Sequence, residues 1–211
     1  MKKTLILTAL LCVAAVCGAQ ESKGGFMAEV GLGFSKFGNY APVSAFVDPT
    51  ESYSMIPSEH ITLGYRFKNN AFVGLNIGSR GGNTSFRYLD ENFFDIDIMA
   101  EVRRIFPLGH RFEFEAGAAL GYLLHGNAYE FAGNTESTSR GGFSCHVMMG
   151  VNYRLSEKTY IGLHAQLPYY ANIGSDGVEL PAGFTAATGL EATTAPAISG
   201  YSLQASVGIR F

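Results

Sequence analysis

The sequence predicts an all-β fold, an eight-stranded antiparallel up-and-down barrel that crosses a membrane. Eight segments alternate apolar residues with small or polar ones, which is the pattern of strands with two unlike faces. Each segment has about nine to thirteen residues, the length of a tilted membrane-spanning strand, whereas strands of soluble proteins average about five or six. Short and long links alternate between the segments, an arrangement typical of transmembrane barrels.

The first 19 residues predict an export signal that is removed from the mature chain. Two lysines precede the apolar stretch Leu5–Val16, and small residues follow it, so we expect cleavage after Ala19. The apolar stretch is about twelve residues long, too short for the roughly 20 that a spanning helix needs. We therefore expect a signal peptide at residues 1–19 and one barrel domain at residues 20–211.

The eight predicted strands place aromatic and aliphatic residues on one face and small or charged residues on the other. The eighth alternates most strictly, with Tyr201, Leu203, Ala205, Val207, Ile209 and Phe211 as its apolar residues. In chain order the predicted strands are Phe26–Phe34, Glu59–Lys68, Ala71–Arg80, Phe94–Arg104, Phe112–His125, Phe143–Leu155, Thr159–Leu167 and Tyr201–Phe211.

The links between these strands are of two kinds. Tight turns are expected at residues 68–70, 107–110 and 156–158, where Asn, Gly, Pro and Ser occur. Long links are expected at residues 35–58, 81–93, 126–142 and 168–199. An even number of strands puts both mature termini at the end with the short turns, so we expect periplasmic turns and termini with long extracellular loops.

The charges of the non-apolar face favour a membrane barrel over the alternative, a soluble barrel with an apolar binding cavity. Acidic and basic side chains occur there in near balance, which suits an interior network of ion pairs. A cavity for an apolar ligand would not tolerate them. These residues are Glu29, Arg66, Arg80, Asp95, Asp97, Glu101, Arg103, Glu113, Glu115, Arg154 and Arg210.

Pairing across the predicted turn at 107–110 brings Arg103 opposite Glu113 or Glu115 and places Glu101 near Glu115. Because an unpaired buried charge is costly, we expect arginines from other strands to complete the network. The predicted structural network comprises Arg66, Glu101, Arg103, Glu113, Glu115, Arg154 and Arg210. This favours a barrel plugged by side chains; the alternative is a path for protons or ions.

Four of the five histidines, His60, His125, His146 and His164, fall on the inward face, three of them toward the long links. Imidazole is a frequent ligand for zinc, so a metal site is one interpretation. The other is hydrogen bonding within a polar lumen. No short ligand spacing such as H-x-x-x-H joins any two of them. We therefore expect no metal and no cofactor.

Ser144 and His146 also share the inward face, and Glu130 or Glu136 could approach them from a long link. Such a nucleophile, base and carboxylate could modify lipid A. A carboxylate supplied by a long link is poorly preorganised, so we expect no catalytic residues.

Charge and cysteine content exclude other classes. The net charge of −3 becomes more negative when the two signal lysines are removed, which argues against a nucleic-acid partner. Cys145 is the only cysteine outside the expected signal, so the mature chain has no internal disulfide.

The strand count, the unequal links and the G-I-R-F ending resemble the small eight-stranded outer-membrane barrels of the OmpX and OmpA-domain type. The glycine-rich strands resemble such proteins from Bacteroidetes-type bacteria. The resemblance implies that the alternating residues from Tyr201 to Phe211 form a C-terminal assembly signal for the barrel-assembly machinery.

The same resemblance implies periplasmic chaperones as assembly partners, and outer-membrane lipid and lipopolysaccharide as surroundings of a monomer. It also implies a non-enzymatic role in surface structure, adhesion or envelope integrity. The alternatives are a secretion or envelope-assembly component, a lipid A-modifying enzyme and a small-solute pore.

Overall fold

The computed structural model describes residues 24–37, 55–86, 89–171, 181–188 and 197–211. The expected signal peptide and parts of three predicted long links, 35–58, 81–93 and 168–199, lie outside these residues. Eight strands form a closed barrel, and α2 (Phe184–Thr188) is a short helix before the last strand. The strands are β1 (Gly25–Phe37), β2 (Ile56–Arg66), β3 (Ala71–Phe86), β4 (Leu89–Leu108), β5 (Phe112–Phe131), β6 (Asn134–Arg154), β7 (Thr159–Ala171) and β8 (Ala197–Arg210).

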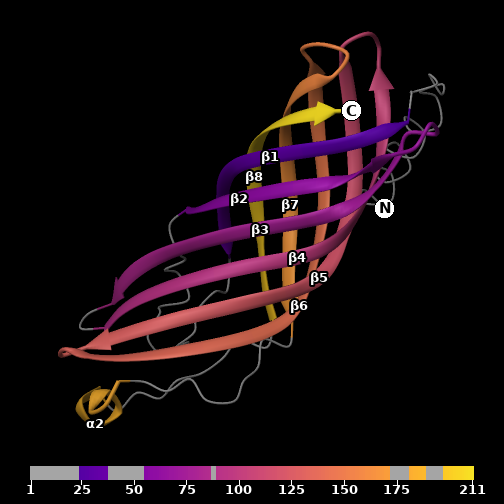
Figure 1. Ribbon diagram of the computed structural model, residues 1–211. Helices are drawn as coiled ribbons and strands as arrows, with labels where there is room; N and C mark the ends of the chain where they lie inside the picture. Colours follow the sequence, from indigo (N-terminus) through magenta and orange to yellow (C-terminus); the bar gives the residue numbers. More distant parts are fainter. Residues whose placement is uncertain (1–23, 38–54, 87–88, 172–180, 189–196) are drawn as a thin grey trace, which may run out of the picture.

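Every strand pairs antiparallel with its neighbours in the sequence, and β1 pairs with β8 to close the ring (Figure 1). This confirms the predicted eight-stranded up-and-down barrel. At the seam, Val30 lies opposite Val207, and the Phe211 amide donates to the Phe26 carbonyl over 2.9 Å. Closure satisfies the backbone groups that a sheet edge would leave unpaired, which a barrel in a membrane requires.

Three tight connections lie at one end of the barrel, which we call the short-turn end. Asn70 in the β2–β3 turn and Gly109 in the β4–β5 turn both have positive φ, of 65° and 88°. Glycine and asparagine adopt this conformation most readily, so the local sequence favours these turns. Phe211 lies at the same end, and we call the opposite end the long-loop end.

Two of the four predicted long links are wrong. Residues 81–93 and 126–142 mostly continue the strands, because β3 reaches Phe86, β4 begins at Leu89, β5 reaches Phe131 and β6 begins at Asn134. Their Gly-, Asn-, Ser- and Thr-rich sequences have the composition of loops, but backbone pairing between neighbouring strands holds them as strands without a regular apolar alternation.

These extensions form a four-stranded distal sheet beyond the rim, made of residues 81–86, 89–94, 126–131 and 134–142 (Figure 1). Among the described residues, β2 pairs with β3 only as far as Arg80, and β7 pairs with β6 only from Phe143. The tip between β5 and β6 has two residues of positive φ, Ala132 and Gly133, as a tight type I′ hairpin requires. Phe184 of α2 packs edge-on against Phe131 at 5.0 Å.

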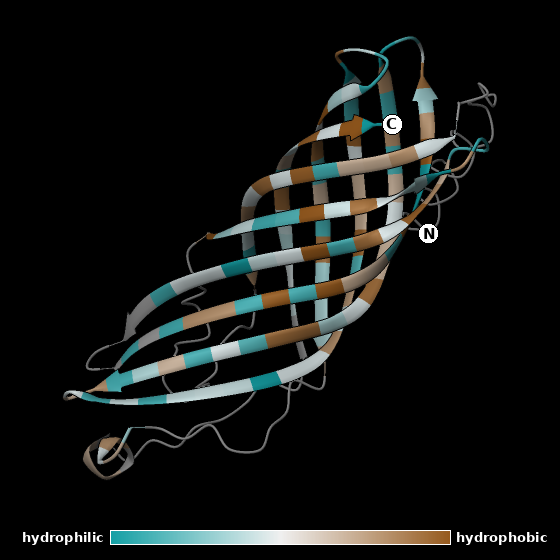
Figure 2. Ribbon diagram, in the orientation of Figure 1, coloured by the Kyte–Doolittle hydropathy of each residue, from teal (hydrophilic) through white to brown (hydrophobic). Residues whose placement is uncertain are grey.

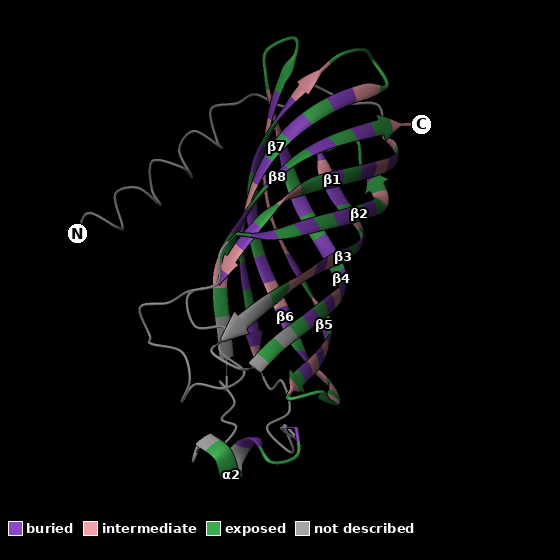
Figure 3. Ribbon diagram, turned by 90° about the vertical axis from the view of Figure 1, so that its left-hand side faces the viewer, coloured by how far each residue is buried: buried purple, intermediate pink, exposed green. Residues whose placement is uncertain are grey.

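The two faces of the barrel wall differ as the sequence predicts. Buried and exposed residues alternate along each strand, and the exposed ones in the barrel are mainly hydrophobic (Figures 2 and 3). Leu32 is 64% exposed and Leu163 is 71% exposed, whereas the Glu101 side chain has no exposure. An apolar outside and a charged inside exclude the soluble barrel with an apolar cavity. No helix in the described part of the chain is long and apolar enough to cross a membrane.

Candidate functional site: the barrel lumen

The lumen holds three polar clusters, which we name by their position along the barrel. The short-turn cluster contains Arg66, Asn70, Glu113 and Arg210. The central cluster contains Glu29, His60, Glu101, Arg103, Glu115 and His164. The long-loop cluster contains Arg80, Asp95, Asp97, His125, Ser144, His146 and Tyr170.

In the short-turn cluster, Glu113 lies between two arginines from different strands. Its carboxylate is 3.1 Å from Nη1 of Arg66, and Arg210 of the last strand also pairs with it. Arg66 donates in addition to the side-chain oxygen of Asn70, the turn residue with positive φ. The turn geometry therefore positions a partner for a buried guanidinium.

Arg154 does not join the carboxylates as the sequence analysis expected. Its guanidinium donates to the carbonyl oxygens of Gly109 and His110, so it holds the β4–β5 turn against β6. The reason is its position as the last residue of β6, which brings its guanidinium beside the carbonyls of the β4–β5 turn.

Arg103 is the centre of the central cluster. Its guanidinium donates to Glu115 at 2.9 Å, to Glu29 at 3.1 and 3.4 Å, and to Glu101. The predicted cross-strand register is wrong, because Arg103 lies opposite Gly117 and the β4–β5 turn falls at residues 109–111. The long side chain still reaches Glu115 diagonally across the two strands, as such neighbours permit.

The histidines of the central cluster flank Glu29. His60 Nε2 is 3.3 Å from Glu29 Oε1, and His164 Nδ1 is 3.7 Å from the same oxygen. The other nitrogen of His164 lies 3.1 Å from the side-chain oxygen of Asn152. The Tyr160 hydroxyl donates to the second oxygen of Glu29 over 2.9 Å.

In the long-loop cluster, Arg80 pairs with both Asp95 and Asp97. The guanidinium carbon also lies 4.6 Å from the ring centre of Tyr170, whose hydroxyl donates to Asp97 over 3.1 Å. His125 contacts Asp95. Every charged group here has a partner of opposite charge or a hydrogen-bond donor, as buried charges require.

The catalytic alternative finds only part of its geometry. Ser144 Oγ lies 3.3 Å from His146 Nε2, but that same nitrogen faces Tyr170 at 2.9 Å. A serine–histidine–carboxylate triad needs a carboxylate hydrogen-bonded to the histidine nitrogen that does not face the serine. Glu130 and Glu136 lie in the distal sheet, paired with Thr135 and Tyr129, because the predicted loop is a hairpin that carries them away from the rim.

Nor does the structure gather the histidines as the sequence analysis considered. His60 contacts Glu29, His125 contacts Asp95, and His146 contacts Ser144 and Tyr170. The histidine nearest to His60 in this set is His164, with ring centres 6.3 Å apart. These two come from β2 and β7, which are far apart in sequence, so no spacing rule could pair them.

Apolar side chains also point into the lumen, in three groups that the strand alternation does not predict. Pairs of consecutive apolar residues in the sequence indicate such groups, because neighbouring residues of a strand face opposite sides and one of each pair must face inward. The pairs are Phe93-Phe94, Ile105-Phe106, Leu123-Leu124, Met148-Met149 and Tyr169-Tyr170. Their buried members are Phe93, Ile105, Leu123, Met148 and Tyr170. The groups are Phe37, Ile56, Phe93, Leu123 and Tyr170; Met99, Ala119 and Met148; and Met27, Phe72, Ile105 and Tyr160.

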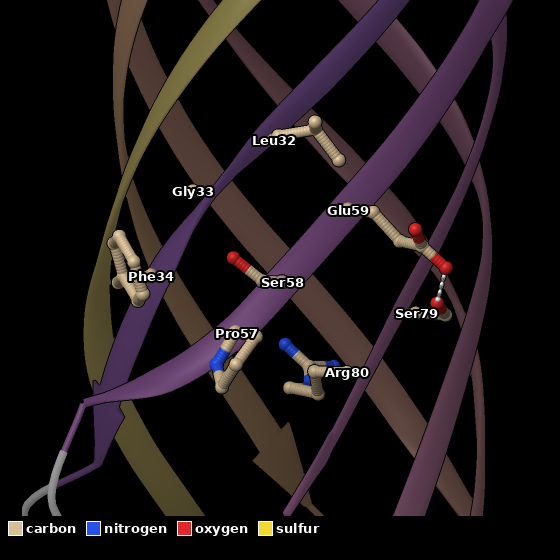
Figure 4. Close-up of a pocket in the computed structure, with 8 residues that line it drawn as sticks. All are labelled: Leu32, Gly33, Phe34, Pro57, Ser58, Glu59, Ser79 and Arg80. Carbon is tan, nitrogen blue, oxygen red and sulfur yellow. Dashed lines mark hydrogen bonds between the residues drawn. The ribbon is translucent and has the colours of Figure 1, made fainter.

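An enclosed space of about 10 Å³ in the lumen, lined by Ser58, His60 and His146 among others, is about the size of one water molecule. A larger groove of about 560 Å³ lies on the wall across β1, β2 and β3 (Figure 4). Leu32, Phe34 and Pro57 line it, and Glu59 accepts a hydrogen bond from Ser79 over 2.6 Å. Ser58 and Arg80 also line the groove, so it combines an apolar side with a polar one.

A closed ring of eight strands with an apolar outside and a charged inside is the design of an outer-membrane barrel. The model of the outer membrane protein beta-barrel domain matches residues 5–211. The chain belongs to this family. Its members are proteins of the bacterial outer membrane, so the predicted location is confirmed at this level. No curated protein sequence is significantly similar to the chain.

Solved structures of small outer-membrane barrels are similar to this one. Neisserial surface protein A has a TM-score of 0.61 at 16% identity, with 90% of this chain and 100% of that chain covered. Ail, the attachment invasion locus protein of Yersinia pestis, has a TM-score of 0.55 at 13% identity and the same coverage. A major outer membrane protein from Thermus thermophilus has a TM-score of 0.51 at 12% identity, again covering 90% and 100%. At these identities the likeness concerns the fold.

Proposed function

We propose that this protein is a non-enzymatic, sealed outer-membrane barrel with a structural or surface-interaction role, in adhesion or envelope integrity. The observation that carries the proposal is the filled lumen. Polar clusters of paired charges alternate with buried apolar groups along the barrel, and eight strands leave room for little more than these side chains. A barrel built in this way is a rigid support.

The element that this rigid barrel supports is the distal sheet, which continues the barrel wall past the rim (Figure 1). We assign it to the outside of the cell and the short turns and mature termini to the periplasm, after removal of residues 1–19. Its β5–β6 hairpin is held by continuous backbone pairing from Gly126↔Ser139 to Phe131↔Asn134. Because these residues are already ordered by backbone pairing, binding a partner costs little further conformational entropy. This favours a role as an interaction surface over a role as a simple link between strands.

The exposed charges of the distal sheet limit its partners. Asp90 and Glu130 are exposed and acidic, while Arg140 is only partly exposed. One structural neighbour, Ail, was crystallised with the heparin analogue sucrose octasulfate. The acidic tips do not favour a polyanion here, so we expect a neutral or basic partner surface. Lipopolysaccharide and outer-membrane lipid surround the barrel in this proposal, and the barrel-assembly machinery and chaperones insert it as a monomer.

The test compares a deletion strain complemented with the full chain or with a barrel whose hairpins are shortened. Asn-Gly replaces residues 84–91 and 128–137, which keeps the pairs Asn83↔Asn92 and Asn127↔Thr138 and the lumen groups. A heat-dependent shift in gel mobility shows that both versions fold. Adhesion of cells to protein-coated surfaces and resistance to detergent are measured.

If the sheet mediates surface contact, the shortened barrel restores detergent resistance but not adhesion. If the barrel serves envelope integrity alone, both versions restore resistance and adhesion does not change. Full resistance and full adhesion in the deletion strain itself would contradict the proposal. Co-purification of either version with an envelope machine in stoichiometric amount would favour the assembly-component alternative instead.

A further inference from the structure

Three nitrogen and oxygen ligand atoms converge in the central cluster from three different strands. Glu29 of β1, His60 of β2 and His164 of β7 each offer one such atom, and all three atoms lie within 4.8 Å of one another. The Glu29 oxygen is 3.3 Å from the His60 nitrogen and 3.7 Å from the His164 nitrogen. Tetrahedral zinc with bonds of about 2.0–2.1 Å needs neighbouring ligands about 3.3–3.4 Å apart.

The surrounding groups hold His164 and Glu29 in the orientation that a metal requires. His164 Nε2 faces Asn152 Oδ1 at 3.1 Å and Glu115 Oε1 at 3.4 Å, two acceptors that keep the proton on that nitrogen. The lone pair is then on Nδ1, which points to Glu29. The Tyr160 hydroxyl fixes the second oxygen of Glu29. Histidine bonded to a carboxylate or carbonyl, with its free nitrogen on the metal, is the usual outer shell of zinc sites.

The charge balance of the central cluster also favours a bound cation. Glu29, Glu101 and Glu115 are buried carboxylates, and Arg103 is the one guanidinium that pairs with all three among the described residues. With neutral histidines the cluster carries two excess negative charges, which is costly in a buried site. One divalent cation removes that excess.

We propose that Glu29, His60 and His164 bind one divalent transition-metal ion, with zinc as the best fit. Two imidazoles and one carboxylate suit zinc and its neighbours, whereas calcium and magnesium require oxygen ligands. The ion joins β1, β2 and β7, and so braces the wall on both sides of the β1–β8 seam. Because the ligands are buried, the ion enters while the barrel folds and exchanges slowly afterwards.

The experiment uses the full mature barrel, unfolded in urea with a chelator and refolded into detergent micelles with ZnSO₄ or without metal. Excess metal is removed, and bound zinc is counted by mass spectrometry. His60→Gln and His164→Gln are the test variants, and His125→Gln is the matched control, since His125 is equally buried but contacts Asp95. Asn152→Ala removes an outer-shell acceptor and is expected to weaken binding about tenfold.

The proposal expects stoichiometric zinc in the wild type and in His125→Gln, and its loss in both test variants. Refolding with Co²⁺ gives the visible absorption of a tetrahedral site in the wild type, a readout that needs no variant to fold. Zinc-free wild-type barrel without a Co²⁺ band, or zinc retained by a folded His60→Gln/His164→Gln variant, would overturn the proposal.

Discussion

Replacing Arg103 by methionine tests the energetic role of the central cluster. The guanidinium lies 2.9 Å from Glu115 and 3.1 Å from Glu29, and it also pairs with Glu101. Methionine keeps much of the side-chain volume, so the change mainly removes the charge. Three carboxylates then remain in a lumen where Glu101 has no exposure and the other two are almost fully buried.

The expected loss of folding stability is set by the least costly way in which the three carboxylates can reduce their mutual repulsion. One carboxylate can take up a proton, which for a glutamate of ordinary pKa near 4.3 costs about 4 kcal/mol at pH 7 and about 1 kcal/mol at pH 5. Breaking a buried ion pair by removing one partner costs about 3–5 kcal/mol, which agrees with the value at pH 7. The loss of stability should therefore be large at pH 7 and shrink as the pH falls.

The assay is unfolding by urea from detergent micelles at pH 7 and pH 5, followed by the heat-dependent gel shift. Arg104→Met is the matched control, because Arg104 is the next residue of β4 but is exposed on the outer wall. It should change stability by well under 1 kcal/mol. An Arg103→Met barrel as stable as the wild type at pH 7, or equally destabilised at both pH values, would refute the reasoning.

Two further predictions concern the chain end and the distal sheet. Deleting Phe211, or replacing it by Asp, should lower the amount of heat-modifiable protein in the outer membrane, because the exposed ring ends the proposed assembly signal; normal amounts would disprove this role. Ala132→Gly should stabilise the β5–β6 hairpin by about 0.5–1 kcal/mol, because Ala132 has a φ of 50°, a conformation that costs less for glycine. Slower amide exchange at Tyr129 and Phe131 measures this effect, and faster exchange would count against it.

The sequence predicts the strands and their two faces because both follow from local alternation. Val30 and Val207 can be placed on the outer wall, and Glu29 and Glu101 in the lumen, without knowledge of any contact. The lengths of β3 to β6 could not be predicted in the same way, because strands that leave the membrane are held by backbone pairing and carry no apolar period.

The contacts within the lumen depend on register and on strands that are distant in sequence. A shift in the β4–β5 turn moves Arg103 from Glu113 or Glu115 to a position opposite Gly117. The approach of His164 to Glu29 depends on how eight strands close and tilt, and no local pattern encodes that. The pairs of consecutive apolar residues are present in the sequence. Reading them as lumen residues requires knowing that apolar side chains pack on the inner face of the wall as well as on the outer face.

The measurement that tests the sealed barrel most directly is electrical recording of the purified wild-type protein in a planar lipid bilayer. With paired charges and buried apolar groups such as Phe93 and Leu123 filling the lumen, insertion should produce no stable conductance steps. A porin inserted in the same membrane shows that the recording works. Stable, uniform steps from the wild-type barrel would contradict a sealed lumen and favour a small-solute pore.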